Sequence, residues 1–312
     1  MKHYLSINDI DSLPSWVDEA ITLKKNPYQF QYLGEQKTIC LLFFNNSLRT
    51  RLSTQKAAMY LGMEVMVMNF GSEGWALEYE DGTIMNQGTS EHIKEAAQVV
   101  SQFCDVVAIR AFAKLEDKTK DEAEEVLTGF AKHASIPIVN MESSVAHPLQ
   151  ALADAITLSE HKTKSKPKVV LSWAPHPKAL PHAVANSFVE MMKKQDAEFV
   201  ITHPKGYELN PEITKGFQIE YDQETALKNA DFVYVKNWSG YMNYGEVLHQ
   251  DTSWMMTQKK LDAAKFMHCL PVRRNVVVED AVLDGHQSLV VEQANNRTFS
   301  ALIVLKKILE VL

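Results

Sequence analysis

Short β-rich runs alternate with helical patterns along most of this chain. Such alternation is typical of α/β proteins with parallel strands, and it predicts two doubly wound parallel sheets joined by helices. The predicted strands are Thr38–Phe44, Glu64–Phe70, Asp105–Phe112, Ile136–Glu142, Lys168–Ala174, Glu198–His203, Asp231–Trp238, Lys265–Pro271 and Ser288–Glu292. The predicted helices are His92–Cys104, Asp121–Ser135, Pro148–His161, Ala179–Gln195, Asp222–Ala230, Asn295–Leu312 and a short one that begins at Asn210-Pro211.

The chain length predicts two domains, since 312 residues exceed the usual size of one. A lysine-rich polar run, Glu160–Pro167, lies between the predicted fourth and fifth strands and is the best boundary candidate. The helix Pro148–His161 precedes it and is expected to bridge the two halves. The last helix, apolar on one face, is expected to pack back on the first domain.

Composition restricts the partners. The net charge of −7 argues against nucleic acid as the main partner, because proteins that bind the phosphate backbone usually carry a basic balance. The three cysteines, Cys40, Cys104 and Cys269, are too few and too far apart to predict a disulfide framework. No apolar signal core and no stretch of transmembrane length occurs, so we expect a cytoplasmic protein without membrane association.

The segment Ser47-Leu48-Arg49-Thr50-Arg51 lies between the apolar run Ile39–Phe44 and an amphipathic stretch that begins near Leu52. A strand that leads through a short loop into a helix directs backbone N–H groups and the positive end of the helix dipole at one point. Two hydroxyls and two guanidiniums there predict a socket for a phosphate-like dianion. The alternative is an ordinary polar helix start, with a Ser or Thr cap and solvated arginines.

Several well-known enzyme motifs are missing. No G-x-G-x-x-G follows a predicted strand, and no G-x-x-x-x-G-K-[ST], H-E-x-x-H, G-x-S-x-G or paired-cysteine metal motif occurs. A nucleotide-binding dehydrogenase is the main competing interpretation of a two-domain α/β chain, and it lacks its usual glycine-rich turn. The sequence therefore favours a phosphate-handling transferase.

Polar residues cluster where the predicted strands end. Ligands of open α/β sheets bind beyond the carboxyl ends of the strands, so these residues are expected to form one site. Each has a plain structural alternative, a hydrogen-bonded histidine or a solvated arginine, but their number favours a site. They are Arg110, Glu142, His147-Pro148-x-Gln150, Lys236, Trp238, His268-Cys269-Leu270-Pro271, Arg273-Arg274-Asn275 and Asn295-Asn296-Arg297, the last just before the final helix.

Three motifs of this chain resemble those of a known protein family. Phe43-x-x-x-Ser47-Leu48-Arg49-Thr50-Arg51, His147-Pro148-x-Gln150 and His268-Cys269-Leu270-Pro271 resemble, in the same order, the hallmark motifs of the aspartate/ornithine carbamoyltransferase family. The resemblance covers essentially the whole chain. It implies a carbamoyl-phosphate domain at 1–147, an amino-acid domain at 148–294, and a C-terminal helix at 295–312 that packs on the first domain. It also implies a homotrimer whose active sites lie between subunits.

The resemblance assigns roles residue by residue. Carbamoyl phosphate would be bound by Ser47, Leu48, Arg49, Thr50, Trp75 of a neighbouring subunit, Arg110, His147, Gln150, Cys269, Leu270 and Arg297. The catalytic groups would be Arg110, His147 and the Cys269–Leu270 backbone, which polarise the carbamoyl oxygen, with Gln150 on the carbamoyl NH2. His147 is expected to donate a hydrogen bond rather than act as a base. No metal and no cofactor are expected.

The acceptor follows from a departure from the family. Ornithine enzymes carry an Asp-x-x-x-Ser-Met-Gly loop for the free α-amino group, whereas this chain has Lys236-Asn237-Trp238-Ser239-Gly240 without a carboxylate. A buried α-ammonium would lack its partner. This segment and Trp75 resemble the branch that acts on N-acylated ornithines. In that branch Lys236 and Arg273 would meet the α-carboxylate, with Glu142 and His176 near the ornithine chain.

The expected choice between a succinyl and an acetyl group on the acceptor depends on Ser90. Enzymes for N-acetylornithine resemble Thr89-Ser90-Glu91-His92 but carry Glu in place of Ser90 and Lys in place of Val277. A neutral side chain at 90 would not repel a succinyl carboxylate, so N-succinylornithine is favoured over N-acetylornithine, with arginine synthesis as the pathway. Ser90 as a mere helix cap is an equal alternative. A non-catalytic protein that binds carbamoyl phosphate is the more distant one.

Overall fold

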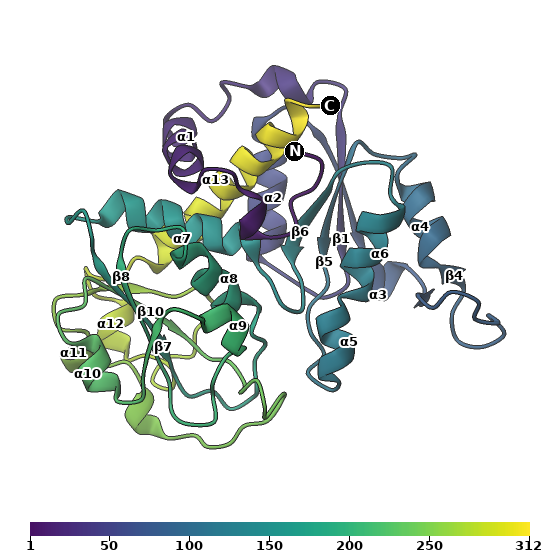
Figure 1. Ribbon diagram of the computed structural model, residues 1–312. Coiled ribbons are helices and arrows are strands. Elements are labelled where there is room, and N and C mark those ends of the chain that lie inside the picture. Colours follow the sequence, from purple (N-terminus) through teal and green to yellow (C-terminus); the bar gives the residue numbers. More distant parts are fainter. The chain divides into compact units, whose positions relative to one another are not determined.

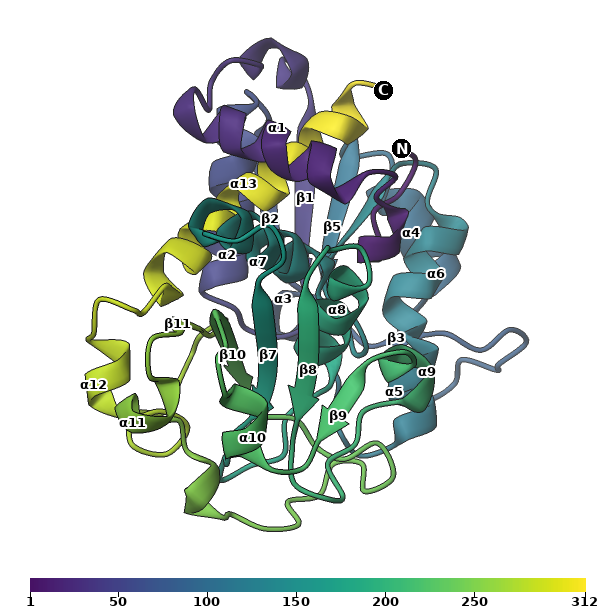
Figure 2. The same cartoon turned by 60° about the vertical axis from the view of Figure 1, so that its left-hand side comes forward.

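The structure is a computed structural model that describes residues 1–312, and the chain divides into two compact units. The first unit comprises Met1–Leu149 and Arg297–Leu312, and the second comprises Gln150–Asn296. Each unit has its own parallel sheet with flanking helices (Figures 1 and 2), which confirms the predicted α/β class. What each predicted domain binds stays a prediction.

The first unit contains a four-stranded sheet with the strand order β2-β1-β5-β6, in which every pairing is parallel. The order reverses between β1 and β5, so the carboxyl ends of these two strands form the switch point where open α/β sheets bind ligands. The elements up to the second sheet are η1 (Ile7–Asp9), α1 (Leu13–Lys25), η2 (Gln31–Gly34), β1 (Thr38–Phe43), α2 (Arg49–Tyr60), β2 (Glu64–Asn69), α3 (Phe70–Glu73), β3 (Leu77–Glu78), β4 (Glu91–His92), α4 (Ile93–Val100), β5 (Val106–Arg110), α5 (Lys118–Ala123), α6 (Glu125–His133), β6 (Ile138–Glu142) and α7 (Pro148–His161).

Strands β1, β5 and β6 of the first unit are largely apolar because both faces of the sheet are covered there. Leu42, Val107 and Ile109 pack against Ile93 of α4 and Phe130 of α6, and all five side chains are buried. Burying one large aliphatic or aromatic side chain stabilises a fold by about 1.5–3 kcal/mol. Helices α4 and α6 therefore hold one face of the sheet in place.

The other helical layer of this unit includes the end of the chain. Phe299 of α13 stacks on Tyr60 of α2, and Lys306 forms an ion pair of 2.7 Å with Glu19 of α1. The Ser300 hydroxyl donates to the Leu149 carbonyl oxygen at 2.8 Å. Figure 1 shows α13 in yellow beside α1 and α2. These contacts fix Arg297, the first α13 residue of this unit.

The second unit contains a five-stranded sheet with the strand order β11-β10-β7-β8-β9, again with parallel pairings throughout. Its switch point lies between β7 and β10. A core of Val170, Val233, Phe266 and Val278 fills one face. The elements are β7 (Lys168–Trp173), α8 (Ala183–Met192), β8 (Glu198–Thr202), α9 (Pro211–Thr214), β9 (Gln218–Glu220), α10 (Gln223–Leu227), β10 (Phe232–Lys236), η3 (Thr252–Trp254), α11 (Gln258–Leu261), β11 (Lys265–Met267), α12 (Asp280–Leu283) and α13 (Val290–Leu309).

Three predicted elements are wrong in part. Ser288–Glu292 is not a strand: Ser288 forms one isolated bridge with Phe266, and α13 begins at Val290. The final helix therefore begins before Asn295, and Asn295-Asn296-Arg297 lies inside it. The predicted helix Asp121–Ser135 is two helices, because Glu124 adopts a left-handed conformation with φ 49° between α5 and α6.

Other elements agree with the prediction from the sequence or were not predicted. Helix α7 has the predicted bounds, and Asn210 caps α9 as expected by accepting from the Glu212 N–H. Helix α1 and the short strands β3, β4 and β9 were not predicted. None of the helices combines the length and the apolar character that a membrane crossing requires.

Candidate active site

The loop after β1 presents a helix start that no side chain caps. Leu48 occupies the N-cap position of α2 and makes no capping hydrogen bond, so the first N–H groups of the helix are not satisfied by a side chain. Arg49 is half-buried, and its Nε is buried without a hydrogen-bond partner. This geometry contradicts the alternative of an ordinary capped helix start. It suits an anion, because the positive end of the helix dipole and the Arg49 guanidinium both belong to this helix start.

Thr50, His147 and Arg297 meet inside the first unit although they are far apart in sequence. The Arg297 Nη2 donates to the Thr50 Oγ1 at 2.5 Å and to the His147 Nε2 at 3.2 Å. All three residues are buried. Since Nε2 of His147 accepts this bond, its proton lies on Nδ1 in this arrangement. His147 can donate from Nε2 only after Arg297 turns away or the ring is protonated.

Arg110 is anchored by its own chain. It lies at the end of β5, opposite Glu142 of β6, and its Nε donates to the Glu142 Oε2 at 2.9 Å. Its Nη1 donates to the carbonyl oxygens of Asn45 and Asn46 at 3.2 and 3.1 Å. Arg110 therefore fastens the loop that leads to Ser47. Glu142, expected near the ornithine chain, neutralises Arg110 in this structure and lies 3.8 Å from the His147 Nε2.

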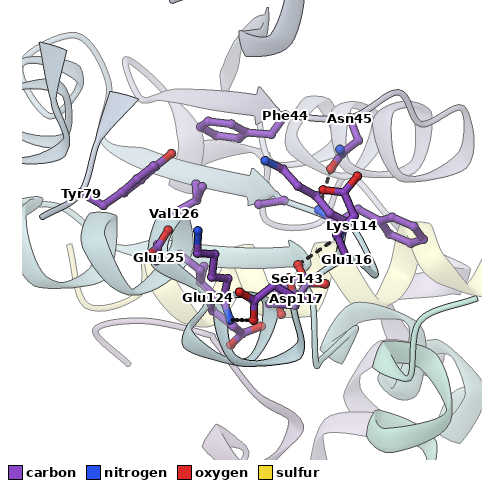
Figure 3. Close-up of a pocket in the computed structure, with 16 residues that line it drawn as sticks. Phe44, Asn45, Tyr79, Lys114, Glu116, Asp117, Glu124, Glu125, Val126 and Ser143 are labelled. Carbon is purple, nitrogen blue, oxygen red and sulfur yellow. Dashed lines mark hydrogen bonds between the residues drawn. The ribbon is translucent and has the colours of Figure 1, made fainter. Parts of the chain in front are cut away.

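A cavity of about 410 Å³ opens at the same edge of the first sheet (Figure 3). Phe44 and Asn45 form one wall, and Glu124 and Ser143 lie opposite. Burial raises the pKa of the Glu124 carboxyl, whose Oε1 accepts from the Val145 N–H at 3.1 Å. None of the predicted ligand-binding residues lines this cavity, so the sequence-based site and the cavity share only the loop after β1.

Trp75 and Ser90 lie on the segment around β3 and β4, and the part between these strands projects away from the sheet (Figures 1 and 2). Trp75 is exposed, and its Nε1 donates to the Glu91 Oε2 at 2.8 Å. Ser90 is exposed too, and its N–H donates to the Ala76 carbonyl oxygen. The N-cap of α4 is His92, whose Nδ1 accepts from the Lys94 N–H. The alternative role of Ser90 as a helix cap is therefore wrong.

In the second unit, Gln150 is almost fully buried on the first turn of α7. Its Nε2 donates to the Asp154 Oδ1 at 2.7 Å, and its Oε1 is buried without a hydrogen-bond partner. The Gln293 Nε2 donates to the same Asp154 oxygen at 2.7 Å. A buried carbonyl oxygen without a partner is costly, so it suits a ligand that donates an N–H.

The loop His268–Pro271 follows β11 directly. The His268 N–H donates to the Gln293 Oε1 at 2.9 Å, and the His268 Nδ1 accepts from the Leu270 N–H at 2.8 Å. Leu270 has φ 57°, and the Leu270–Pro271 bond is cis. Cys269 is buried and forms no disulfide. The loop is thus held from Gln293 on one side and by its own histidine on the other.

His176 and Arg273 meet in the second unit, as two of the predicted acceptor-binding residues should. The Arg273 Nε donates to the His176 Nε2 at 3.1 Å, and the His176 Nδ1 lies 2.8 Å from the Lys178 carbonyl oxygen. Burial, followed by the charges of Arg273, Lys236 and Lys178, lowers the pKa of His176. The imidazole is therefore neutral at pH 7, and the surrounding cations create a field that favours a carboxylate.

Trp238 and Asn237 have structural roles beside Lys236. Trp238 is fully buried, and its Nε1 donates to the Tyr207 carbonyl oxygen at 2.7 Å. The Asn237 Nδ2 donates to the Ala174 carbonyl oxygen at 2.7 Å. These bonds tie the end of β10 to its neighbours. Lys236 is half-buried at the last position of β10.

Four residues that support the site were not predicted: Asn45 and Asn46, which bind Arg110, and Asp154 and Gln293, which bind Gln150 and His268. The position of Asp154, one helical turn after Gln150, is a signal that the sequence contains. The role of Gln293 depends on tertiary contacts and leaves no local signal.

The chain belongs to the aspartate/ornithine carbamoyltransferase family. Residues 2–160 match the carbamoyl-P binding domain of this family, and residues 181–307 match its Asp/Orn binding domain. The family predicted from the three motifs is confirmed, and carbamoyl transfer is its class of activity.

Relatives place the chain within the family. It is 46% identical to N-succinylornithine carbamoyltransferase of Bacteroides thetaiotaomicron, with 99% of both chains covered. It is 33% identical to N-acetylornithine carbamoyltransferase of Xanthomonas axonopodis pv. citri, with 95% of this chain and 93% of the other covered. A crystal structure of an N-acetyl-L-ornithine transcarbamylase variant with one glutamate replaced by valine, complexed with carbamyl phosphate and N-succinyl-L-norvaline, matches with a TM-score of 0.93. The identity there is 32%, over 99% of this chain and 100% of that one.

Proposed function

We propose that this protein transfers the carbamoyl group of carbamoyl phosphate to the side-chain amine of N-succinyl-L-ornithine, giving N-succinylcitrulline and phosphate in arginine biosynthesis. The full-length relative at 46% identity carries the proposal, since its name states this acceptor. The segment 236–240 supports it, because it has no carboxylate for a free α-ammonium group.

The first unit supplies the residues that bind the phosphate. Ser47, Leu48, Arg49 and Thr50 bind the phosphate at the uncapped start of α2, and the buried Arg49 Nε supports this assignment. Arg297 reaches the phosphate from α13, and Trp75 comes from a neighbouring subunit. When Arg297 turns to the phosphate, the His147 Nε2 loses its present donor and, once it carries a proton, can donate to the carbamoyl oxygen.

The carbamoyl group is recognised at its oxygen and at its NH2. Arg110, His147 and the Cys269–Leu270 backbone act on the oxygen, where negative charge develops. The Gln150 Oε1 accepts from the NH2, and its burial without a partner supports this role. The Leu270 backbone contributes on the same side.

The reaction needs positioning more than proton chemistry. The neutral acceptor amine attacks the carbamoyl carbon, a C–N bond forms, and the C–O bond to phosphate breaks. Phosphate leaves with the electron pair of the broken C–O bond and takes up the proton that the amine nitrogen loses. Lys236 and Arg273 bind the α-carboxylate of the acceptor, while Glu142 and His176 lie along the ornithine chain. The pairing of Arg273 with neutral His176 supports this carboxylate site.

The assembly is a cytoplasmic homotrimer with shared sites. Exposed apolar side chains support an interface on the first unit: Leu48 at the N-cap of α2, Leu52 and Met59 within α2, and Met66 on the edge strand β2. Leu48, Leu52 and Met59 have the spacing of one helix face, and exposed apolar patches mark interaction sites. Ser90 of one subunit would then lie beside the acyl group in the site of another.

N-acetylornithine is the second candidate acceptor, because relatives and solved neighbours with this specificity cover nearly the whole chain. The test is parallel measurement of carbamoyl transfer from carbamoyl phosphate to ornithine, N-acetylornithine and N-succinylornithine. We expect the highest kcat/KM with N-succinylornithine and no transfer to ornithine. A preference for N-acetylornithine would replace the acyl assignment, and binding of carbamoyl phosphate without transfer to any of the three would indicate a non-catalytic protein.

A further inference from the structure

Asp154 is a fully buried acid directly behind Gln150. It lies one turn further along α7, and its Oδ1 accepts from the Gln150 Nε2 and the Gln293 Nε2, each at 2.7 Å. Burial of a carboxylate is costly unless it is well hydrogen-bonded, so this residue is retained in the core at a thermodynamic cost. Asp154 is not among the residues that the proposed function places on a ligand.

The carboxylate determines which end of the Gln150 side chain faces outward. A side-chain amide has an oxygen and an NH2 that occupy similar space, whereas an ionised carboxylate only accepts hydrogen bonds. The Nε2 must therefore face Asp154, and the Oε1 must face away from it. That Oε1 is the buried atom without a partner. Asp154 thus keeps a hydrogen-bond acceptor at the place where Gln150 would meet the ligand.

The same carboxylate orients a second amide. Because the Gln293 Nε2 donates to Asp154, the Gln293 Oε1 faces the backbone N–H of His268, which donates to it at 2.9 Å. Asp154 therefore acts on both sides of the predicted carbamoyl subsite in this unit, the first turn of α7 and the loop 268–271. Burial, and then the Asp154 carboxyl, raise the pKa of the nearby Tyr234 hydroxyl.

We propose that Asp154 is the positioning residue by which the site selects carbamoyl phosphate over acetyl phosphate. By fixing the orientation of the Gln150 amide, it makes the site prefer an NH2 group over a methyl group on the acyl carbon. The inference deepens the proposed function and rests on it. Without Asp154 the Gln150 amide can turn its NH2 toward the ligand, which places donor against donor for carbamoyl phosphate but costs acetyl phosphate little.

The test compares the Kd values of carbamoyl phosphate and acetyl phosphate, two ligands that differ only by NH2 and CH3 on the acyl carbon. For Asp154→Leu, close in size but unable to accept, we expect the preference for carbamoyl phosphate to fall by about 5- to 100-fold, as for loss of a buried hydrogen bond. The Kd of inorganic phosphate should stay within about twofold of wild type. Equal weakening of both acyl phosphates would show a merely structural role and overturn the proposal.

A double-mutant cycle tests whether Asp154 acts through Gln150. In a Gln150→Ala background, Asp154→Leu should change the preference no further. Asp154→Ala is the second variant if the leucine variant does not fold: it removes the acceptor without overfilling the core, so the preference should fall at least about threefold. An unchanged preference in the alanine variant, or a further full-sized loss without Gln150, would refute the proposal.

Glu160→Gln is the matched control, because Glu160 also lies on α7 and accepts from an α13 side chain, Asn296, at 2.8 Å. This variant should retain the wild-type preference.

The two hypotheses remain separable: failure of the wild-type protein to bind carbamoyl phosphate would reject the proposed function. Wild-type preference for carbamoyl phosphate that persists in the Asp154 variants would reject only this inference.

Discussion

Arg49 and Arg51 lie two positions apart but have different surroundings. The Arg49 Nε is buried without an acceptor, whereas the Arg51 Nη2 donates to the Asn69 side chain and its guanidinium lies 4.7 Å from the centre of the Phe43 ring. The motif alone gives both residues the same chemistry. Their contacts are consistent with the proposed ligand role of Arg49 and give Arg51 a structural role.

We therefore expect Arg49→Ala to reduce kcat/KM by more than about 100-fold, since it removes the proposed charge-assisted contact to the phosphate of carbamoyl phosphate, which is the leaving group. Its melting temperature should stay near that of wild type. Arg51→Ala is the control and should lower stability by about 1 kcal/mol, as loss of a cation–π and hydrogen-bond contact does. Steady-state kinetics and thermal unfolding of both variants test this, and a reversed pattern would exchange their roles.

Ser90 is the residue on which the acyl assignment depends. It is exposed and does not cap α4, so its side chain is available to a neighbouring site. Ser90→Glu would place two carboxylates within about 5 Å of each other if the succinyl group lies there. Such a pair in a partly desolvated cleft is disfavoured by on the order of 1–3 kcal/mol, a factor of about 5 to 150.

The measurement is the ratio of kcat/KM for N-succinylornithine to that for N-acetylornithine, before and after Ser90→Glu. We expect the ratio to fall by that factor, with Ser90→Ala as a neutral control that leaves it unchanged. Exposed charges in water interact weakly, so an unchanged ratio for the glutamate variant would place the acyl pocket elsewhere.

At the scale of elements, local pattern predicted the type of most strands and helices, and tertiary contacts decided the exceptions. Val290 and Val291 are β-favouring in sequence, yet they begin α13, where packing of the buried Val290 in the core overrides propensity. The break between α5 and α6 requires a left-handed glutamate that also accepts from the Val145 N–H. Neither a glycine nor a proline marks it, so the sequence could not reveal it.

The contact between α4 and α6 depends on Gly129. An added Cβ would lie 2.6 Å from the Ile93 Cγ1, which is closer than real Cβ atoms approach. Alanine favours helices by about 1 kcal/mol over glycine, but forced overpacking costs about 1–3 kcal/mol. We expect Gly129→Ala to lower the free energy of unfolding, measured by urea denaturation. Gly88→Ala, where no atom lies within 4 Å, is the control, and stabilisation by Gly129→Ala would show that α4 moves freely.

For the whole molecule, the sequence could name candidate residues for the chemistry, because strand-end motifs are local. It could not predict their present partners. Arg110 is hydrogen-bonded to Glu142 and to the loop after β1, and Arg297 is hydrogen-bonded to His147. Both arrangements depend on strand register and helix packing. Nor could it separate the buried Trp238 from the exposed Trp75, because the burial of an aromatic side chain depends on its tertiary surroundings.

The proposed trimer makes a prediction about sites shared between chains. Trp75 binds Glu91 and makes no hydrogen bond to the residues Ser47–Thr50 of its own chain, although both lie in the first unit. If the Trp75 of one subunit completes the phosphate site of another, Arg49→Ala and Trp75→Ala should each be inactive but should complement each other. A mixed oligomer contains sites with Arg49 from one chain and Trp75 from the other.

After dissociation and reassembly of an equal mixture, random assortment should restore about a quarter of wild-type activity, because each site draws its two residues independently. Light scattering should show three copies per particle for wild type and for both variants. Each variant reassembled alone is the control and should stay inactive. Absence of complementation in a trimer would mean that each site is built within one chain, and full activity of a dilute monomer would remove the need for assembly altogether.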